Sequence, residues 1–278
     1  MNVKKALQVL RNGHTTLKTA YLMRTAPINP APVIVLGHSK TGTTAIAMLL
    51  GQATGKVVQS DICWRIKGQK NFREKLYRQE VTLHQFIDNN RLYFQADIIK
   101  EPTLSFFYND LSFVFDKSRF IFINRDPRDN IRSILNRLKI PGNLALLDDC
   151  QTSKLSPGWK FMLKSNLPFG LVSHYIDKLA HWYNLAADTY IKHGDNMVLI
   201  RYEDFVKDKV GEIGNLARAV EFEPIHDIQN QVDIQYQPRG NRDVSWVEFF
   251  GIENLNRIET ICGERMKEFG YNLSSQLN

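Results

Sequence analysis

A glycine-bounded loop between an apolar run and a predicted helix is the first feature of the sequence that indicates chemistry. The apolar run ends at Gly37 and the loop closes at Gly42. Because glycine adopts backbone conformations that other residues avoid, the loop amides and the first free N–H groups of the helix can converge on one anion. A phosphate group is the natural ligand of such a turn. The residues that we expect at this phosphate are Ser39, Lys40, Thr41, Gly42, Thr43 and Thr44.

The position of the lysine distinguishes this loop from the nucleotide-binding loop of ATPases and GTPases. That loop requires a lysine followed by serine or threonine at the start of the helix. Here Thr43 and Thr44 hold those positions, and Lys40 lies inside the loop. The departure argues against a P-loop kinase or NTPase that uses ATP and magnesium. That class and a noncatalytic nucleotide-binding module are the two alternatives that stay open.

A second predicted turn from strand to helix carries an arginine and a serine at a regular separation. Arg125 ends the apolar run, and Asp126 and Pro127 suit the N-cap and first turn of the helix that follows. Ser133 follows Arg125 by eight positions, about two helical turns, so its hydroxyl can reach the same ligand when the loop folds back. An ordinary capped helix with a solvated basic face is the alternative, its charges supplied by Arg128, Arg132 and Arg137.

Together the two turns resemble the phosphate sites of the sulfotransferases that use 3′-phosphoadenosine 5′-phosphosulfate (PAPS). Two independent anion sites in the right order are improbable by accident. The resemblance implies that Lys40 and the loop amides hold the 5′-phosphate and stabilise the charge that grows on the bridging oxygen. It also implies that Arg125 and Ser133 hold the 3′-phosphate, which distinguishes this donor from ATP.

Two later segments are similar to segments of the same family. Residues 197–208 are predicted to form a strand and a corner, and the resemblance implies that Tyr202 at this corner reaches toward the adenine. An aromatic plug at the sheet edge is the alternative. Ahead of Trp246 lies a loop in which, by the resemblance, Arg239 and Gly240 close over the 3′-phosphate. A solvated charged loop is the alternative there.

The chain departs from the cytosolic members of the family at two positions. Those enzymes often carry a tryptophan directly after the two threonines to stack on the adenine, whereas this chain has Ala45. They also use a histidine as catalytic base, and the aligned position here holds Pro102. The chain therefore resembles more closely the bacterial and the carbohydrate or tyrosylprotein branches, whose base is usually a carboxylate.

Three side chains compete for the role of general base, which takes the proton of the acceptor. Asp61 follows the second predicted strand, 19 residues after Gly42, at a spacing similar to that of the catalytic glutamate in tyrosylprotein and some bacterial members. Glu101 follows the third strand beside Lys100, and His38 lies in the loop itself. We favour Asp61 slightly over Glu101, and Lys100 is a candidate to neutralise the donor or the transition state.

The elements that must position these residues alternate between apolar strands and helices. Helices are predicted to begin at Thr43 and Pro127, with a long helix near 171–193. This order indicates an α/β fold with a mostly parallel central sheet flanked by helices, a P-loop-NTPase-like three-layer architecture. Ligands of such sheets bind beyond the carboxyl ends of the strands, where both phosphate turns lie. The strands are predicted at 33–36, 56–59, 96–99, 120–124 and 197–201.

Length and composition indicate one catalytic domain. The chain has 278 residues, of which 43% are hydrophobic, enough to bury a sizeable core. We expect a single domain over residues 1–278 with its core at about 31–251. A long connection at 140–170 is interpreted as an acceptor lid, because loops of this length are uncommon inside a domain. An ordinary packed surface excursion is the alternative.

The charge and the cysteines of the chain indicate which classes of partner and which cellular compartment to expect. The chain has 36 basic and 29 acidic residues, a net charge of +7 that suits a polyanionic nucleotide and favours an anionic acceptor. The basic residues are spread along the chain, so nucleic acid is not favoured. Three separated cysteines and no transmembrane-length stretch predict a cytoplasmic enzyme. We expect PAPS as co-substrate without a metal, and a hydroxyl or amine acceptor that is a glycan, lipid or metabolite; a homodimer stays open.

Overall fold

The strands at the centre of the molecule are short apolar runs with both faces covered. Successive side chains of a strand point to opposite faces of the sheet. Ile34 and Leu36 therefore join one buried cluster, while Val33 and Val35 join a second cluster on the other side. Burial on both faces is typical of parallel sheets. The computed structural model describes three stretches of the chain, residues 17–66, 72–236 and 243–274.

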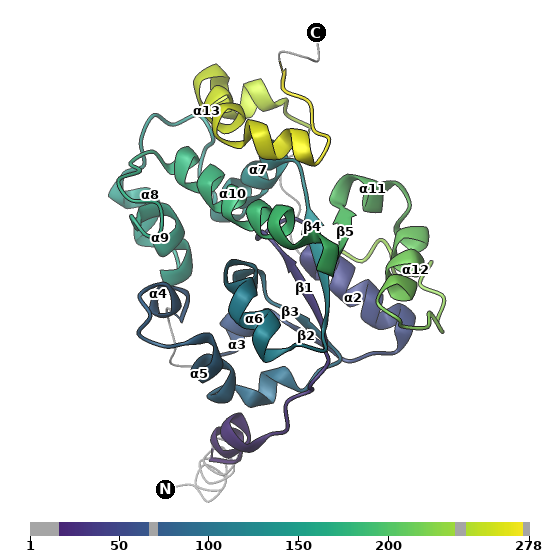
Figure 1. Ribbon diagram of the computed structural model, residues 1–278. Helices are drawn as coiled ribbons and strands as arrows, with labels where there is room; N and C mark the ends of the chain where they lie inside the picture. The colour runs from purple at the N-terminus through teal and green to yellow at the C-terminus, as the bar shows by residue number, and fades with distance from the viewer. Residues whose placement is uncertain (1–16, 67–71, 237–242, 275–278) are drawn as a thin grey trace, which may run out of the picture.

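Five parallel strands form the sheet, in the order β2-β3-β1-β4-β5 (Figure 1). The central strand, β1, pairs with β3 on one side and with β4 on the other, so that Gly37 lies opposite Ile123. Every pairing in this sheet is parallel, which confirms the predicted α/β fold with a P-loop-like layered architecture. The strands are β1 (Val33–Gly37), β2 (Val58–Ser60), β3 (Ile98–Lys100), β4 (Arg119–Asn124) and β5 (Met197–Arg201).

Three long helices and several short ones cover one face of the sheet. The long helices α10 and α13 pack against each other and against α7 over the side chains of β4 (Figure 1). The long helices are α7 (Pro127–Leu138), α10 (Tyr175–His193) and α13 (Trp246–Glu268). The short elements on this face of the sheet are α3 (Ile62–Arg65), α4 (Phe72–Tyr77), α5 (Leu83–Asp88), η1 (Arg91–Phe94), η2 (Pro102–Phe107) and α6 (Tyr108–Val114).

The opposite face is covered by α2 (Thr43–Thr54), α11 (Tyr202–Lys207) and α12 (Lys209–Ala219), which lie together beside the sheet in Figure 1. Apolar residues of these helices complete the second buried cluster. A short turn, η3 (Gly194–Asn196), leads from α10 into β5. None of the helices in the described stretches combines the length and apolar character that a membrane crossing requires.

Capping side chains explain where two of the predicted helices begin. Asp126 accepts a hydrogen bond from the backbone N–H of Arg128 at 2.9 Å, which confirms the predicted N-cap of α7. The long helix predicted from about residue 171 begins at Tyr175, because His174 caps it by accepting from the N–H of Ile176. Strands β2 and β3 each start two residues later than predicted.

The segment 140–170, predicted as a loop, contains two short helices, α8 (Asp149–Ser153) and α9 (Pro157–Lys164). Asp148 and Gln151 form a reciprocal capping box at the start of α8. Helix α9 packs on α10, where the indole N–H of Trp182 donates to the carbonyl of Met162 at 3.1 Å. The prediction of a continuous loop was wrong because helices of five and eight residues carry little periodic signal.

Candidate functional site

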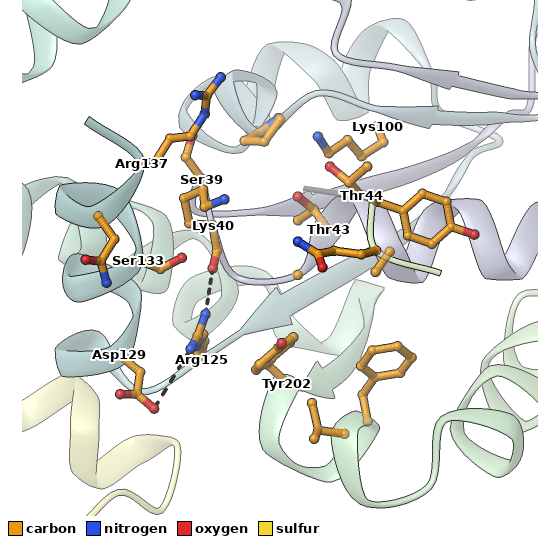
Figure 2. Close-up of a pocket in the computed structure, with 18 of the residues that line it drawn as sticks. Ser39, Lys40, Thr43, Thr44, Lys100, Arg125, Asp129, Ser133, Arg137 and Tyr202 are labelled. Carbon is orange, nitrogen blue, oxygen red and sulfur yellow. Dashed lines mark hydrogen bonds and ion pairs between the residues drawn. The ribbon is translucent and has the colours of Figure 1, made fainter. Parts of the chain in front are cut away.

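A cavity of about 670 Å³ opens beyond the carboxyl ends of the strands (Figure 2). It is bounded by the loop after β1, by residues that directly follow β2, β4 and β5, by the last residue of β3, and by one face of α7. Residues 232–236 close the side nearest to α2. The predicted edge of the sheet is therefore where the candidate residues gather.

Two glycines fix the loop that follows β1, here called the glycine loop (residues 37–42). Gly37 and Gly42 have φ values of 129° and 99°, which side chains disfavour. A Cβ on Gly37 would overlap the carbonyl oxygen of Ile123, and one on Gly42 would overlap the ring of Tyr202. No side chain in the described part of the chain caps the start of α2, which leaves its first amides to an anion.

Five of the six predicted loop residues line the cavity, and one turns inward. Thr41 is fully buried, and its hydroxyl donates to the carbonyl of His38 at 2.8 Å. Its backbone N–H donates to the same carbonyl at 3.3 Å, so Thr41 stabilises the turn through both groups. The cavity-lining residues of the glycine loop and the start of α2 are Ser39, Lys40, Gly42, Thr43 and Thr44.

Arg125 lies between the glycine loop, α7 and the corner after β5. Its guanidinium donates to the carbonyl of Lys40 at 3.2 Å, lies 3.9 Å from the carboxylate of Asp129, and stacks 4.5 Å from the ring centre of Tyr202. The side chain is only 7% exposed, so its orientation is fixed. Ser133 lines the same cavity one helical turn beyond Asp129 (Figure 2). The structure thus brings together the predicted arginine and serine.

An acidic and a basic side chain form a pair at the ends of β2 and β3. The amine of Lys100 lies 2.5 Å from the carboxylate of Asp61, and both residues line the cavity. Lys100 is 2% exposed, whereas the Asp61 side chain is 32% exposed. The second carboxylate oxygen of Asp61 accepts from the hydroxyl of Ser60 at 3.0 Å. The carboxylate is therefore held at a fixed position with one side open to solvent.

Glu101 is buried in a different environment. One of its carboxylate oxygens accepts from the N–H of Thr103 at 3.1 Å, and the other accepts from the N–H of Cys63 at 3.0 Å. The residue is 1% exposed and is absent from the lining of the cavity. Its contacts hold the start of η2 against the start of α3, which is a structural role.

His38 is also directed away from the cavity. Its Nδ1 donates to the side-chain oxygen of Asn130 at 2.7 Å, and the amide nitrogen of Asn130 donates to the carbonyl of Ser39 at 2.8 Å. Burial lowers the pKa of His38 to about 4, and the positive charge of Arg73 acts in the same direction. The imidazole is therefore neutral at physiological pH and ties the glycine loop to α7.

Tyr202, below the glycine loop in Figure 2, belongs to a set of cavity-lining side chains here called the aromatic wall (Tyr202, Phe205, Val206 and Tyr236). Tyr202 packs against Gly42, and Phe205 and Val206 of α11 continue the wall. Sequence reasoning missed one member, Tyr236, whose hydroxyl donates to the side chain of Gln52 on α2 at 3.1 Å. Its distance along the chain from α2 hides this contact from local patterns.

The predicted residues Arg239 and Gly240 lie outside the described residues, but their flanks lie on the cavity. Tyr236 lines it on one side. On the other side, the carbonyl of Val244 accepts from Arg132 at 2.6 Å, and the indole of Trp246 donates to Asp129 at 2.8 Å. Both ends of the connecting segment are therefore attached at the cavity rim.

Two of the three arginines that could have formed a solvated face of α7 are buried. Arg128 is 2% exposed and pairs with Asp126 and Glu259. Arg132 pairs with Asp129 at 2.6 Å. Both arginines hold α7 to neighbouring segments, so the interpretation of a uniformly solvated basic face is wrong for them. The third, Arg137, is exposed on the cavity rim.

Three comparisons place these features among known proteins. The sequence model described as "Sulfotransferase domain" matches residues 30–239. No curated protein sequence matches the chain. The structure is similar to that of sulfotransferase STF9 from Mycobacterium avium, with a TM-score of 0.56 and 15% identity over 94% of this chain and 82% of that one. Mouse sulfotransferase SULT7A1, complexed with PAP, gives a TM-score of 0.49 and 12% identity over 90% of this chain and 89% of that one.

Proposed function

The chain belongs to the sulfotransferase domain family, and we propose that it moves a sulfuryl group from PAPS to a hydroxyl or amine of an acceptor at the cavity described above. PAPS-dependent sulfotransferase activity is the activity of this family. The observation that carries the assignment to this cavity is the convergence of Lys40, Arg125 and Ser133 on it, from a loop and a helix far apart in sequence.

The donor side of the cavity fits a nucleotide with two separate phosphate groups. Lys40 and the uncapped amides at the start of α2 supply positive potential at one point, where they would hold the 5′-phosphate. Arg125 and Ser133 supply it at a second point, where they would hold the 3′-phosphate. Arg239 and Gly240 are proposed to complete this second point.

The aromatic wall fits the adenine. Tyr202 presents a ring beside Gly42, and Tyr236, whose hydroxyl bonds Gln52 of α2, lines the same cavity as Ala45. Ala45 leaves space on the helix where cytosolic relatives have a tryptophan. We propose that Tyr236 provides the aromatic surface that position 45 lacks, because a flat base binds favourably between aromatic rings.

Asp61 is the general base in this proposal. Glu101 is buried with both carboxylate oxygens bound to backbone N–H groups, and His38 is buried outside the cavity lining, whereas Asp61 lines the cavity. As the acceptor oxygen or nitrogen bonds to sulfur, its proton moves to the carboxylate of Asp61 and the bond from sulfur to the 5′-phosphate oxygen breaks. Lys100 orients the carboxylate, and Lys40 stabilises the negative charge that develops on the departing phosphate.

The segment 140–170 is proposed to cover the acceptor. Trp159 of α9 lines the cavity, and α9 is held to α10 through an aromatic cluster. A cover built on two short helices can adjust while its base stays packed.

All three cysteines are free thiols, which supports the proposal of a reducing, cytoplasmic compartment.

Calorimetric titration with 3′-phosphoadenosine 5′-phosphate (PAP), the form of the donor that remains after transfer, tests the proposed donor site. We expect the wild type to bind PAP tightly without magnesium and to bind ATP with magnesium more weakly. Lys40→Ala should reduce PAP affinity and also reduce transfer of radiolabelled sulfate from PAPS. Tight binding of ATP with magnesium and indifference to PAP would contradict the proposal and favour the kinase alternative.

A further inference from the structure

Arg137 is the feature of the cavity that the proposed reaction does not use. It lies in the last turn of α7, is exposed, and lines the cavity. Other cavity-lining cations contact acidic side chains: Lys100 pairs with Asp61, and Lys209 pairs with Asp233 at 2.8 Å. Within the stretches that the structure describes, Arg137 has no hydrogen-bonding or ion-pairing partner.

The position of Arg137 on α7 places it beyond the donor phosphates. Asp129, Ser133 and Arg137 are spaced by four residues and therefore share one face of the helix. Figure 2 shows them in succession, with Arg137 beyond Ser133, on the side of Ser39 and away from Tyr202. Because the proposed 3′-phosphate site lies at Arg125 and Ser133, Arg137 lies on the side of the cavity that this proposal leaves to the acceptor.

The groups around that part of the cavity define what can bind there. Asp61 and Lys100 lie at the ends of β2 and β3, Pro102 follows them, and Trp159 closes the side formed by α9. Trp159 is half-buried, so its indole offers a flat apolar surface. The carboxylate of Asp61 is already neutralised by Lys100. An acceptor that carries a negative charge thus meets an unpaired guanidinium and a compensated carboxylate.

We propose that Arg137 binds an anionic substituent of the acceptor, and that the acceptor is a ring compound with a hydroxyl group and a carboxylate, phosphate or sulfate ester. This inference rests on the proposed function. The ring would lie against Trp159, the hydroxyl would face Asp61, and the anion would accept the paired N–H groups of Arg137. Guanidinium and carboxylate or phosphate form such two-point contacts readily.

The test uses hydroxyl compounds in matched pairs that differ in one negative charge. The pairs are 4-hydroxybenzoate with 4-hydroxybenzamide, galacturonate with galactose, and the 6-phosphate and 6-sulfate of N-acetylglucosamine with the parent sugar. Binding to the PAP-loaded protein is followed by NMR, and sulfate transfer is followed with radiolabelled PAPS. The three kinds of anion distinguish a carboxylate from a phosphate or a sulfate ester as the preferred substituent.

We expect the wild type to prefer the anionic member of at least one pair by about three- to tenfold. Arg137→Gln, which keeps length and polarity but removes the charge, should abolish the preference and leave the neutral member unaffected. Raising the salt concentration should reduce the preference in the wild type, because the guanidinium is exposed. The matched control is Lys160→Gln, which makes the same charge change on the exposed side of α9 outside the cavity lining.

Three results would overturn the inference while leaving the sulfotransferase assignment intact. The wild type could show no preference in any pair, the preference could survive in Arg137→Gln, or Arg137→Gln could reduce the affinity for PAP. The last result would place Arg137 in the donor site. Failure of the proposed function is separate, because it appears as failure of the wild type to bind PAP before any acceptor is added.

Discussion

The proposed donor side and the proposed acceptor side of the cavity are built in different ways. The proposed 5′-phosphate site depends on backbone geometry as well as on Lys40: the glycine loop has two residues with φ near or above 100°, and the amides at the start of α2 lack a capping side chain. On the acceptor side, the important groups are side chains from separate elements, namely Asp61, Lys100, Trp159 and Arg137.

The two sides differ in how strongly they depend on single backbone positions. A backbone site depends on a few glycines and tolerates little change, since a Cβ on Gly37 or Gly42 would overlap its neighbours. Arg137 and Trp159 lie on helices α7 and α9, outside the sheet. The two sides should therefore respond differently to substitution, and the following predictions test that separation.

Asp61→Asn should cause the largest loss. Removing the proposed base should lower kcat by about 100- to 10,000-fold, while PAP affinity changes little, because the donor phosphates bind elsewhere. Steady-state kinetics and PAP calorimetry on the same preparation check this. Asp233→Asn is the matched control, since Asp233 also lines the cavity and pairs with a lysine. Equal losses of rate in the two variants would argue against Asp61 as the base.

Gly42→Ala should reduce PAP affinity by about 10- to 100-fold, because the new Cβ meets the ring of Tyr202 and strains a backbone with φ of 99°. Calorimetry measures the affinity, and thermal unfolding reports the accompanying loss of stability. Gly158→Ala is the control, because a Cβ there meets nothing within 4 Å. Unchanged PAP affinity in Gly42→Ala would mean that the loop is not the donor site.

Tyr236→Ala should reduce the affinity for PAP by about tenfold, which is within the range expected for loss of one aromatic side chain stacked on a base. A ribose bisphosphate without adenine should bind the variant and the wild type equally. Adding Ala45→Trp to the variant should restore part of the lost affinity. An equal loss for the compound without adenine would show that Tyr236 acts on the structure of the cavity and not on the base.

His38 should give the smallest effect, seen in the pH dependence of stability. Its pKa is lowered to about 4 in the folded protein, so below pH 6.5 the unfolded chain takes up a proton that the folded one does not. Stability is therefore lost as the pH falls, by about 1 kcal/mol at pH 5.5 relative to neutral pH. Denaturant unfolding of the wild type and His38→Gln at both pH values should show that the free energy of unfolding falls less in the variant. An equal fall in the two proteins would contradict this.

Much of the donor side could be predicted from the sequence because each of its motifs is local. Gly37, Gly42 and Lys40 lie within one loop, and Arg125 and Ser133 lie within two helical turns. The apolar strands that carry them are fully buried, so their hydrophobicity was a reliable signal. The all-parallel sheet follows from the alternation of these strands with helices.

The acceptor side could be predicted only in part because its contacts are long-range. Sequence alone favoured Asp61 only slightly over Glu101 and kept His38 as a candidate. In the structure, Glu101 and His38 are buried outside the cavity lining, whereas Asp61 lines the cavity. The contact of Tyr236 with Gln52 joins positions that no local pattern connects. Helices α8 and α9 were missed because they are only five and eight residues long, too short to show a clear helical periodicity.

The most direct test of the account is calorimetric titration of PAP into three proteins: the wild type, Arg125→Ala and Asp61→Asn. If donor binding and proton transfer are carried by separate sides of the cavity, Arg125→Ala should lose at least tenfold in affinity, while Asp61→Asn should bind as the wild type does. Equal affinity in all three proteins, or an equal loss in both variants, would contradict the separation.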